Sequence, residues 1–225
     1  MPSKELQMAE EKVRALGVWL SMDPDVTKSL NYKDKTEKIN LILGCGKLRR
    51  VGLLGKITVL KSSIASQLVY IFSPLETNHT AIKDINVMFC NFLWNDKGDK
   101  IKRNIMINDY SEGGLKMIDI ASFNRFLKAT WIKKYLDKEN CGSCKRFFDS
   151  ELDKYGCEVA LTGNLNIKDS HNIIKVSDPF FKEILEIWSE ANYEENIMSD
   201  YHLRSSPLWY NSLIRVENRP VFYKD

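Results

Sequence analysis

The sequence predicts a mainly α-helical protein with a short strand near the N-terminus and a small hairpin near the C-terminus. Apolar residues recur at steps of three and four in several segments, which is the period of a helix with one buried face. Helix-start signals precede most of these segments, whereas strand-like patterns occur near the two ends. With 225 residues and 44% hydrophobic content, the chain is long enough to bury a core.

The first predicted elements are a strand and a surface helix. Ala15–Leu20 is rich in strand-forming residues, and the turn Asp23-Pro24-Asp25 ends it. A helix is predicted over Asn31–Leu43, where apolar residues at helical spacing alternate with charged ones. Gly44 and Gly46 are expected to end this helix because glycine destabilises helical backbone.

Two amphipathic helices are predicted next. The first covers Leu53–Phe72, and Pro74 ends it because proline cannot continue a helix. Asn78 is a suitable N-cap for the second helix, and a turn is expected over Asn95–Lys100. The residues predicted for the inner face of the second helix are Ile82, Ile85, Phe89, Phe92 and Leu93.

Three elements are predicted in the rest of the chain. Asp119 can cap a helix over Ile120–Leu136, and proline at the first turn indicates another helix over Phe180–Asn192. A weak alternation over Leu213–Tyr223 predicts a hairpin. The inner stripe expected for the first of these helices is Phe123, Leu127, Trp131 and Tyr135.

The charged residues are distributed unevenly along the chain. Residues 1–150 hold 25 Lys and Arg against 17 Asp and Glu, whereas residues 151–225 hold 8 against 13. A polyanionic partner is therefore expected to bind the first two-thirds. The segment Lys47–Leu75 contains cations but no acid, and an ordinary solvated helix face is the alternative explanation. The candidate nucleic-acid-binding residues are Lys47, Arg49, Arg50, Lys56 and Lys61.

Membrane insertion and secretion are not expected. The longest apolar run, Ile57–Phe72, is interrupted by Lys61 and is too short to cross a bilayer. No secretory signal opens the sequence, so we expect an intracellular protein with reduced cysteines. No sequence pattern indicates a cofactor or a small-molecule substrate.

Two ligand-binding patterns fit the sequence poorly. Cys141 and Cys144 have the first spacing of a zinc site, but the gaps to Cys157 and His171 are irregular, so unpaired thiols are favoured. The run from Gly52 to Lys56 lacks the glycine spacing and the hydroxyl of a phosphate-binding loop.

Four blocks in order carry a resemblance to a known family. They are Leu16-Gly17-Val18, Lys47–Leu75, Phe92-Leu93-Trp94 and Gly113-Gly114-Leu115. The segment from about Lys12 to Asn140 resembles the region after the polymerase palm in LINE-type (non-long-terminal-repeat) retrotransposon reverse transcriptases. The resemblance continues more weakly to Asp225.

The resemblance implies a domain organisation and a function. Residues 1–25 are similar to the end of the palm, residues 26–140 to the helical thumb, and residues 141–225 to part of the C-terminal extension. The chain is then expected to be a fragment that clamps the RNA/DNA template–primer duplex in the parent protein. The acidic residues that hold the catalytic metals lie upstream in that family, so the chain itself is not expected to be an enzyme.

Three positions depart from the family pattern. Gly46 and Cys144 stand where relatives carry Trp, and Gly52 stands where Ser or Thr is usual. Loss of a large core aromatic is destabilising, so a decayed reading frame without selected function is one alternative. A helical protein-interaction module, derived from the same ancestor, is another.

Overall fold

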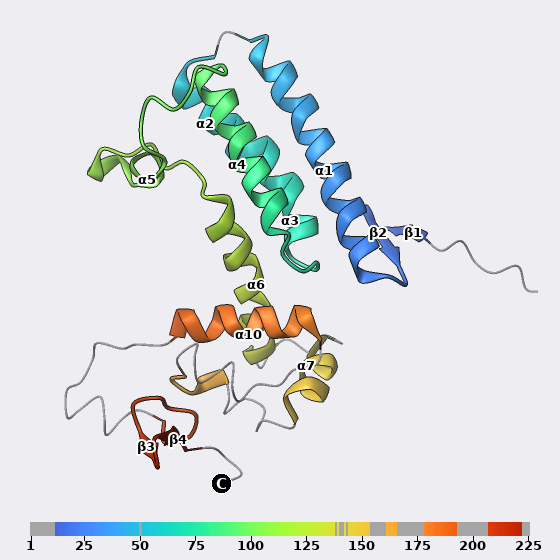
Figure 1. Cartoon of the computed structure of the whole chain (residues 1–225), viewed down its shortest axis with the longest axis vertical. Coiled ribbons are helices and arrows are strands. Elements are labelled where there is room, and N and C mark those ends of the chain that lie inside the picture. The colour runs from blue at the N-terminus through green and yellow to red at the C-terminus, as the bar shows by residue number, and fades with distance from the viewer. Residues whose placement is uncertain are drawn as a thin grey trace, which may run out of the picture. The chain divides into compact units, whose positions relative to one another are not determined.

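The computed structural model describes residues 12–49, 51–137, 139, 142, 144–153, 161–165, 178–192 and 207–221. The described residues are mainly helical, with a two-stranded antiparallel hairpin near each end, which confirms the predicted fold class (Figure 1). The chain divides into two compact units, residues 1–124 and 125–225. This division falls within helix α6 (Ile120–Leu136), earlier in the chain than the predicted boundary after residue 140.

The first unit contains a β-hairpin where the sequence predicted a single strand. Strands β1 (Lys12–Ala15) and β2 (Val18–Ser21) pair antiparallel around Leu16 and Gly17. Both turn residues have positive φ, 51° and 84°, as a two-residue type I′ turn requires. Because leucine rarely adopts this conformation, the pattern indicated one continuous strand.

Helix α1 (Pro24–Lys47) is longer than predicted at both ends. It begins earlier because the Asp23 carboxylate accepts hydrogen bonds from the amides of the first turn. It also continues through Gly44 and Gly46, which were predicted to end it. Gly46 faces the Phe92 ring, and a Cβ atom there would approach the ring to 2.9 Å. Glycine therefore permits close packing at this position.

The helix predicted over residues 53–72 is confirmed, with a π-helical stretch in its middle. Helix α2 (Leu53–Val59), the π-helix η1 (Leu60–Ala65) and α3 (Ser66–Phe72) follow one another without a break. Their buried apolar residues face the core of the first unit and are Ile57, Leu60, Ile64, Ala65, Leu68, Ile71 and Phe72.

Helix α4 (His79–Trp94) also agrees with the prediction. The Asn78 side chain accepts a hydrogen bond from the amide of Ala81 at 3.0 Å. The helix ends at Asn95, whose φ of 53° is left-handed. Helices α1 and α2 lie against α4, and α3 lies against α1 (Figure 1). All five residues predicted for the inner face are buried: Ile82, Ile85, Phe89, Phe92 and Leu93.

Two short helices that the sequence did not predict follow α4. They are α5 (Arg103–Ile107) and the 3₁₀-helix η2 (Tyr110–Glu112). The glycine pair after them is required by geometry. Gly113 has φ of 77°, and a Cβ atom on Gly114 would lie 2.0 Å from the carbonyl oxygen of Asn108. The chain can therefore turn back closely onto its own backbone at this point.

The second unit contains the rest of α6, helices α7 (Cys144–Leu152) and α10 (Pro179–Asn192), and a hairpin of β3 (Arg215–Val216) and β4 (Arg219–Pro220). The Asp178 carboxylate caps α10, which confirms the predicted start. The hairpin was also predicted. The buried core of the second unit contains Ile132, Tyr135, Phe148, Leu152, Leu161, Leu165, Ile184, Leu185 and Tyr210.

The inner stripe of α6 lies one position later than the sequence predicted. The helix itself is confirmed, since the Asp119 carboxylate accepts from the amide of Ser122 at 2.7 Å. Of the predicted stripe only Tyr135 is buried, whereas the other three residues are partly exposed. The buried residues of α6 are Ile120, Asn124, Lys128, Ile132 and Tyr135. A lysine in this stripe made the exposed and buried faces hard to tell apart.

Candidate nucleic-acid interface

The predicted phosphate-binding cations do not form one continuous surface. Lys47 is the last residue of α1, and the exposed Arg49 follows it. Lys56 lies in α2 and Lys61 in η1. Arg50 lies outside the residues that the structure describes. These positions differ in burial and in their partners.

Lys56 is buried and forms part of the core, contrary to its predicted role in phosphate contact. Its side chain is only 6% exposed, and its ammonium donates to the carbonyl oxygens of Phe92 and Leu93 at 2.8 and 3.1 Å. It also donates to Oδ1 of Asn95 at 2.7 Å. Burial lowers the pKa of Lys56, and the nearby ammonium of Lys47 lowers it further. All three ammonium protons are therefore donated to acceptors at the C-terminal end of α4, where a cation is favourable.

Lys47 joins the end of α1 to the loop that follows α4. Its ammonium lies 2.9 and 2.7 Å from Oδ1 and Oδ2 of Asp96. Both side chains are partly exposed, and exposed ion pairs of this kind contribute only about 0.2–1 kcal/mol. A phosphate could therefore displace Asp96 at low cost, so the position of Lys47 is compatible with the predicted contact.

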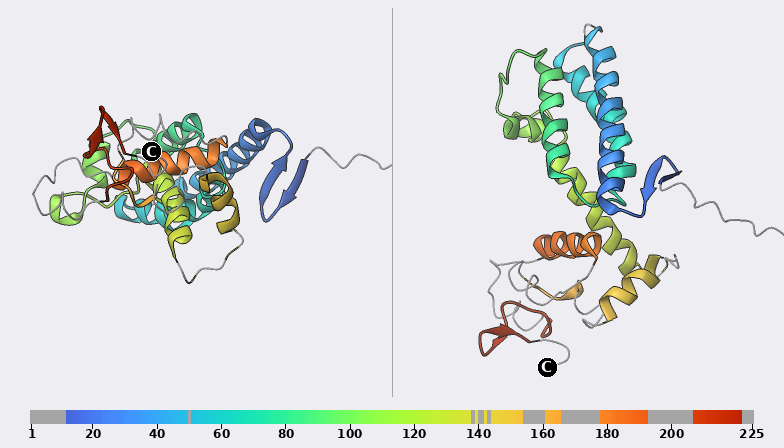
Figure 2. Two further views of the ribbon diagram at one scale, coloured as in Figure 1. Left: turned by 90° about the horizontal axis from the view of Figure 1, so that it is seen from below. Right: turned by 45° about the vertical axis from the view of Figure 1, so that its right-hand side comes forward.

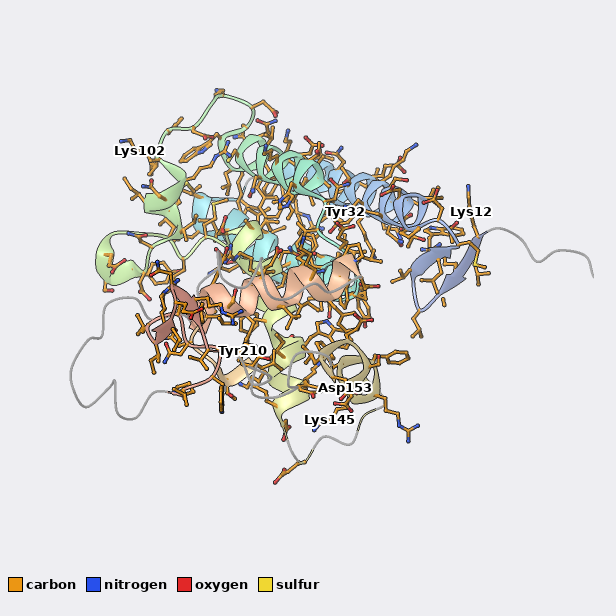
Figure 3. All side chains as sticks on the ribbon, turned by 60° about the horizontal axis from the view of Figure 1, so that its bottom comes forward. Lys12, Tyr32, Lys102, Lys145, Asp153 and Tyr210 are labelled. Atoms are coloured by element: carbon orange, nitrogen blue, oxygen red, sulfur yellow. The ribbon has the colours of Figure 1, made fainter. Side chains whose placement is uncertain are left out.

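The loop after α4 adds three cations that sequence reasoning did not select. Lys97, Lys100 and Lys102 are exposed, and none has an acidic partner among the described residues. Figure 3 shows Lys102 on this loop. Their close spacing in the sequence is the signal that could have identified these three lysines as candidates. We call Lys47, Arg49, Lys97, Lys100 and Lys102 the basic end of the first unit.

The acids near the basic end are already paired. Asp96 binds Lys47, and Asp99 lies 3.1 Å from Nε of Arg103. Asp99 and Arg103 also reach Cys90 of α4, and burial raises the pKa of the Cys90 thiol. The loop therefore folds back onto α4. The net charge that remains available at this end is positive.

Lys61 lies on a different face of the continuous helix formed by α2, η1 and α3. It is exposed on η1, whereas Lys56 points into the core. The segment from Val51 to Leu75 contains no acid. Exposed hydroxyl residues surround Lys61 on this face, namely Thr58, Ser62, Ser63 and Ser66. Lys61 is thus available for a phosphate but is separate from the basic end.

A hollow of about 350 Å³ lies between α1 and α4, beside the basic end. Its lining combines apolar side chains with amides and one ion pair: Asn40, Leu43, Gly44, Lys47, Met88, Asn91 and Asp96. A volume of this order is at the small end of ligand sites in proteins.

The described residues contain no group of three His, Cys, Asp or Glu side chains arranged to hold a metal ion. The zinc hypothesis is not addressed by this, since Cys141, Cys157, His171 and the side chain of Cys144 lie outside the described residues. Cys45 is exposed and Cys90 is buried, and both are free thiols. No described helix is both long enough and apolar enough to pass through a bilayer.

A comparison with protein-family models finds none that matches this sequence.

Proposed function

We propose that this chain corresponds to the thumb and part of the C-terminal extension of a LINE-type reverse transcriptase. In the parent protein, its first unit would clamp the RNA/DNA template–primer duplex. The observation that supports this most is the basic end, where Arg49 and three loop lysines project without acidic partners among the described residues. Proteins bind nucleic-acid duplexes without sequence preference mainly through such cations.

The shape of the duplex suits this kind of contact. An RNA–DNA hybrid near A-form exposes its phosphates and a shallow minor groove, so recognition depends on shape and charge. Lys47 can exchange Asp96 for a phosphate, and the flexible stems of the loop lysines can follow the backbone. Lys56 supports the site indirectly because it fixes the end of α4 from which the loop starts. Polymerisation chemistry is assigned to the palm of the parent protein.

Salt-dependent binding of a hybrid duplex tests the proposal. A fluorescent RNA–DNA hybrid is titrated with the chain by anisotropy at several salt concentrations. Each neutralised phosphate contributes about 0.9 to the slope of log K against log salt on duplex DNA. The triple variant Lys97→Gln/Lys100→Gln/Lys102→Gln should therefore bind more weakly and flatten the slope by about two to three.

A matched variant controls for total charge. Lys33 and Lys83 are also exposed and have no acidic partner among the described residues, but they lie in the N-terminal halves of α1 and of α4. Lys33→Gln/Lys83→Gln should lower affinity much less than the loop variant Lys97→Gln/Lys100→Gln, which removes the same amount of charge. If the wild-type chain shows no salt-sensitive binding, or if both variants weaken binding equally, the proposed clamp is refuted.

The second candidate is a helical protein-interaction module, which the hollow between α1 and α4 favours. Gly44 lines it, and a Cβ atom added there meets no other atom within 4 Å. Gly44→Phe would therefore add an aromatic side chain at a position that lines the hollow. Under the clamp proposal this variant should retain the affinity for the hybrid, whereas the loop variant loses it. Under the interaction-module alternative, the wild-type chain should show no salt-dependent affinity for the hybrid, and neither variant should change its binding.

A further inference from the structure

The hairpin β1–β2 has two outer edges, and its register shows which backbone groups lie on them. Around a two-residue turn, Ala15 and Val18 form a hydrogen-bonded pair, and such pairs alternate along the ladder with pairs that are not hydrogen-bonded. The pair Arg14–Trp19 is therefore not hydrogen-bonded, and neither is the pair Lys12–Ser21 further from the turn. Their N–H and C=O groups point away from the partner strand.

Helix α1 closes the outer edge of β2. Oδ1 of Asn31 accepts from the amide of Trp19 at 2.7 Å, and Nδ2 of Asn31 donates to the Trp19 carbonyl at 2.7 Å. The hydroxyl of Thr27 accepts from the amide of Ser21 at 2.8 Å and donates to its carbonyl at 3.3 Å. Two side chains thus provide every hydrogen bond that a neighbouring strand would provide along this edge.

Among the residues that the structure describes, nothing pairs with the outer edge of β1. No described residue hydrogen-bonds the outward N–H or C=O of Lys12 or Arg14, and all four residues of β1 are exposed. The hairpin stands beside the first turns of α1 (Figure 2), and Lys12 lies on the hairpin away from the helices (Figure 3). An unpaired edge is a template for another strand. Two strands alone are also only marginally stable, so a third strand is favourable.

The side chains of β1 define the chemistry of that strand. Lys12 and Arg14 share one face; Arg14 lies 3.7 Å from Asp34 of α1, whereas Lys12 has no acidic partner among the described residues. Val13 points to the other face beside Leu20, its cross-strand partner, and these two side chains are 55% and 49% exposed. A strand added here would match β1 best with acidic residues opposite the cations and an apolar residue between them.

Pairing of β1 with a second copy of itself is disfavoured. An antiparallel self-pair centred on Val13 would place Lys12 opposite Arg14, and like charges directly opposite each other destabilise a sheet. Charge complementarity therefore favours a different partner.

We propose that the outer edge of β1 is a strand-addition site for a protein partner that presents an extended acid–apolar–acid segment. This surface lies at the start of α1, whereas the basic end lies at its C-terminus, so the proposal does not depend on nucleic-acid binding. The partner's backbone bonds the outward groups of Lys12 and Arg14. Its central apolar side chain covers Val13 and Leu20.

Peptide binding tests the site. The whole chain is titrated with a peptide of alternating Glu and Val, and with one of alternating Lys and Val, while backbone amides are followed by NMR. The Glu–Val peptide should bind and should protect the Lys12 and Arg14 amides from hydrogen exchange. Arg14→Pro removes an outward N–H but no hydrogen bond within the hairpin. It should lower the affinity at least about tenfold relative to Arg14→Gln, which keeps the N–H.

A charge reversal makes the test independent of the proline variant. Lys12→Glu should shift preference from the Glu–Val peptide toward the Lys–Val peptide, with the Trp19 amide still protected by Asn31. The proposal is overturned if the wild-type chain binds neither peptide or both equally, or if Arg14→Pro binds as tightly as Arg14→Gln. Dimerisation through β1 in sedimentation experiments would also overturn it.

Discussion

Lys56 of α2 donates a hydrogen bond of 2.7 Å to the side chain of Asn95, the left-handed residue that ends α4. The same ammonium binds two carbonyls of the last turn of α4. One side chain therefore satisfies carbonyl groups that have no partner within their own helix. It also fixes the point from which the basic loop leaves the helical core.

Lys56→Met should destabilise the first unit. The thioether keeps the packing of the aliphatic stem, but the carbonyls of Phe92 and Leu93 lose their partner while they remain buried. Loss of such a buried, charge-assisted interaction is expected to cost about 2–4 kcal/mol. Urea unfolding followed by circular dichroism measures the change in the free energy of unfolding.

Lys61→Met is the matched control, because Lys61 is exposed in the following turns and has no ion pair among the described residues. Its free energy of unfolding should remain within about 0.5 kcal/mol of wild type. Equal stability of the two variants would contradict the structural role assigned to Lys56.

Two neighbouring glycines of α1 should respond to alanine in opposite directions. A Cβ atom on Gly44 meets nothing within 4 Å, so Gly44→Ala should stabilise the helix by about 0.5–1 kcal/mol. A Cβ atom on Gly46 comes to 2.9 Å from the buried Phe92 ring, and Gly46→Ala should cost about 1–3 kcal/mol. Thermal or urea unfolding of both variants measures the difference. A gain in stability for Gly46→Ala would contradict this prediction and would show that the Phe92 ring moves aside at little cost.

Asp109 and Lys116, in the loop around η2, should titrate as a coupled pair. The hydrogen bond from Lys116 lowers the pKa of Asp109, and the same contact raises the pKa of Lys116. Asp109 thus contributes stability above its unfolded pKa of 3.8, and loses it as pH falls through its lower folded value. Lys116 contributes below 10.5 and loses its contribution as pH rises through its higher folded value.

Lys116→Met should therefore raise the pKa of Asp109 toward its ordinary value. An NMR titration of the Asp109 carboxyl carbon in both proteins measures it. Lys97→Met, which removes a lysine with no acidic partner among the described residues, should leave that titration unchanged. An unchanged titration in Lys116→Met would contradict the contact.

The buried lysine of the second unit should couple strongly to its partner. Lys128 is fully buried, lies 3.2 Å from Glu183, and sits 4.4 Å above the Phe180 ring. Lys128→Met removes the buried ion pair with Glu183 and should cost about 3–5 kcal/mol. The double variant Lys128→Met/Glu183→Leu should cost less than the two single changes added together.

Urea unfolding of the four proteins in this cycle gives the coupling energy. The pair Lys182→Met and Glu186→Leu is the control, since these side chains are more exposed and lie 3.9 Å apart. Its coupling should be below about 1 kcal/mol. A coupling of the same size in both cycles would mean that burial adds nothing to the interaction.

Local signals in the sequence were sufficient for most of the helices. Asn78, Asp119 and Asp178 each cap the helix that was predicted to follow them. The hairpin around Leu16 was missed because its turn uses a residue that rarely adopts left-handed backbone. Gly44 and Gly46 were misread as stop signals for α1, and only the opposing Phe92 ring reveals why glycine is required at Gly46.

The candidate site was only partly predictable because the fate of a lysine depends on partners distant in the sequence. Lys56 bonds a residue 39 positions away, and Lys128 bonds one 55 positions away. Nothing in the adjacent sequence distinguishes them from the exposed Lys61. The lysines of the loop after α4 were overlooked for the opposite reason, since they follow a turn rather than an amphipathic stripe.

The π-helical turn over Leu60–Ala65 has a consequence for how this chain tolerates shortening. A π-turn holds one residue more than an α-turn. Removal of Ser62 would leave the buried Leu60, Ile64 and Leu68 separated by three and four positions, which is ordinary helical spacing. A one-residue deletion should be absorbed here by a return to regular α-helix, whereas in α4 it would rotate half of the inner face into solvent.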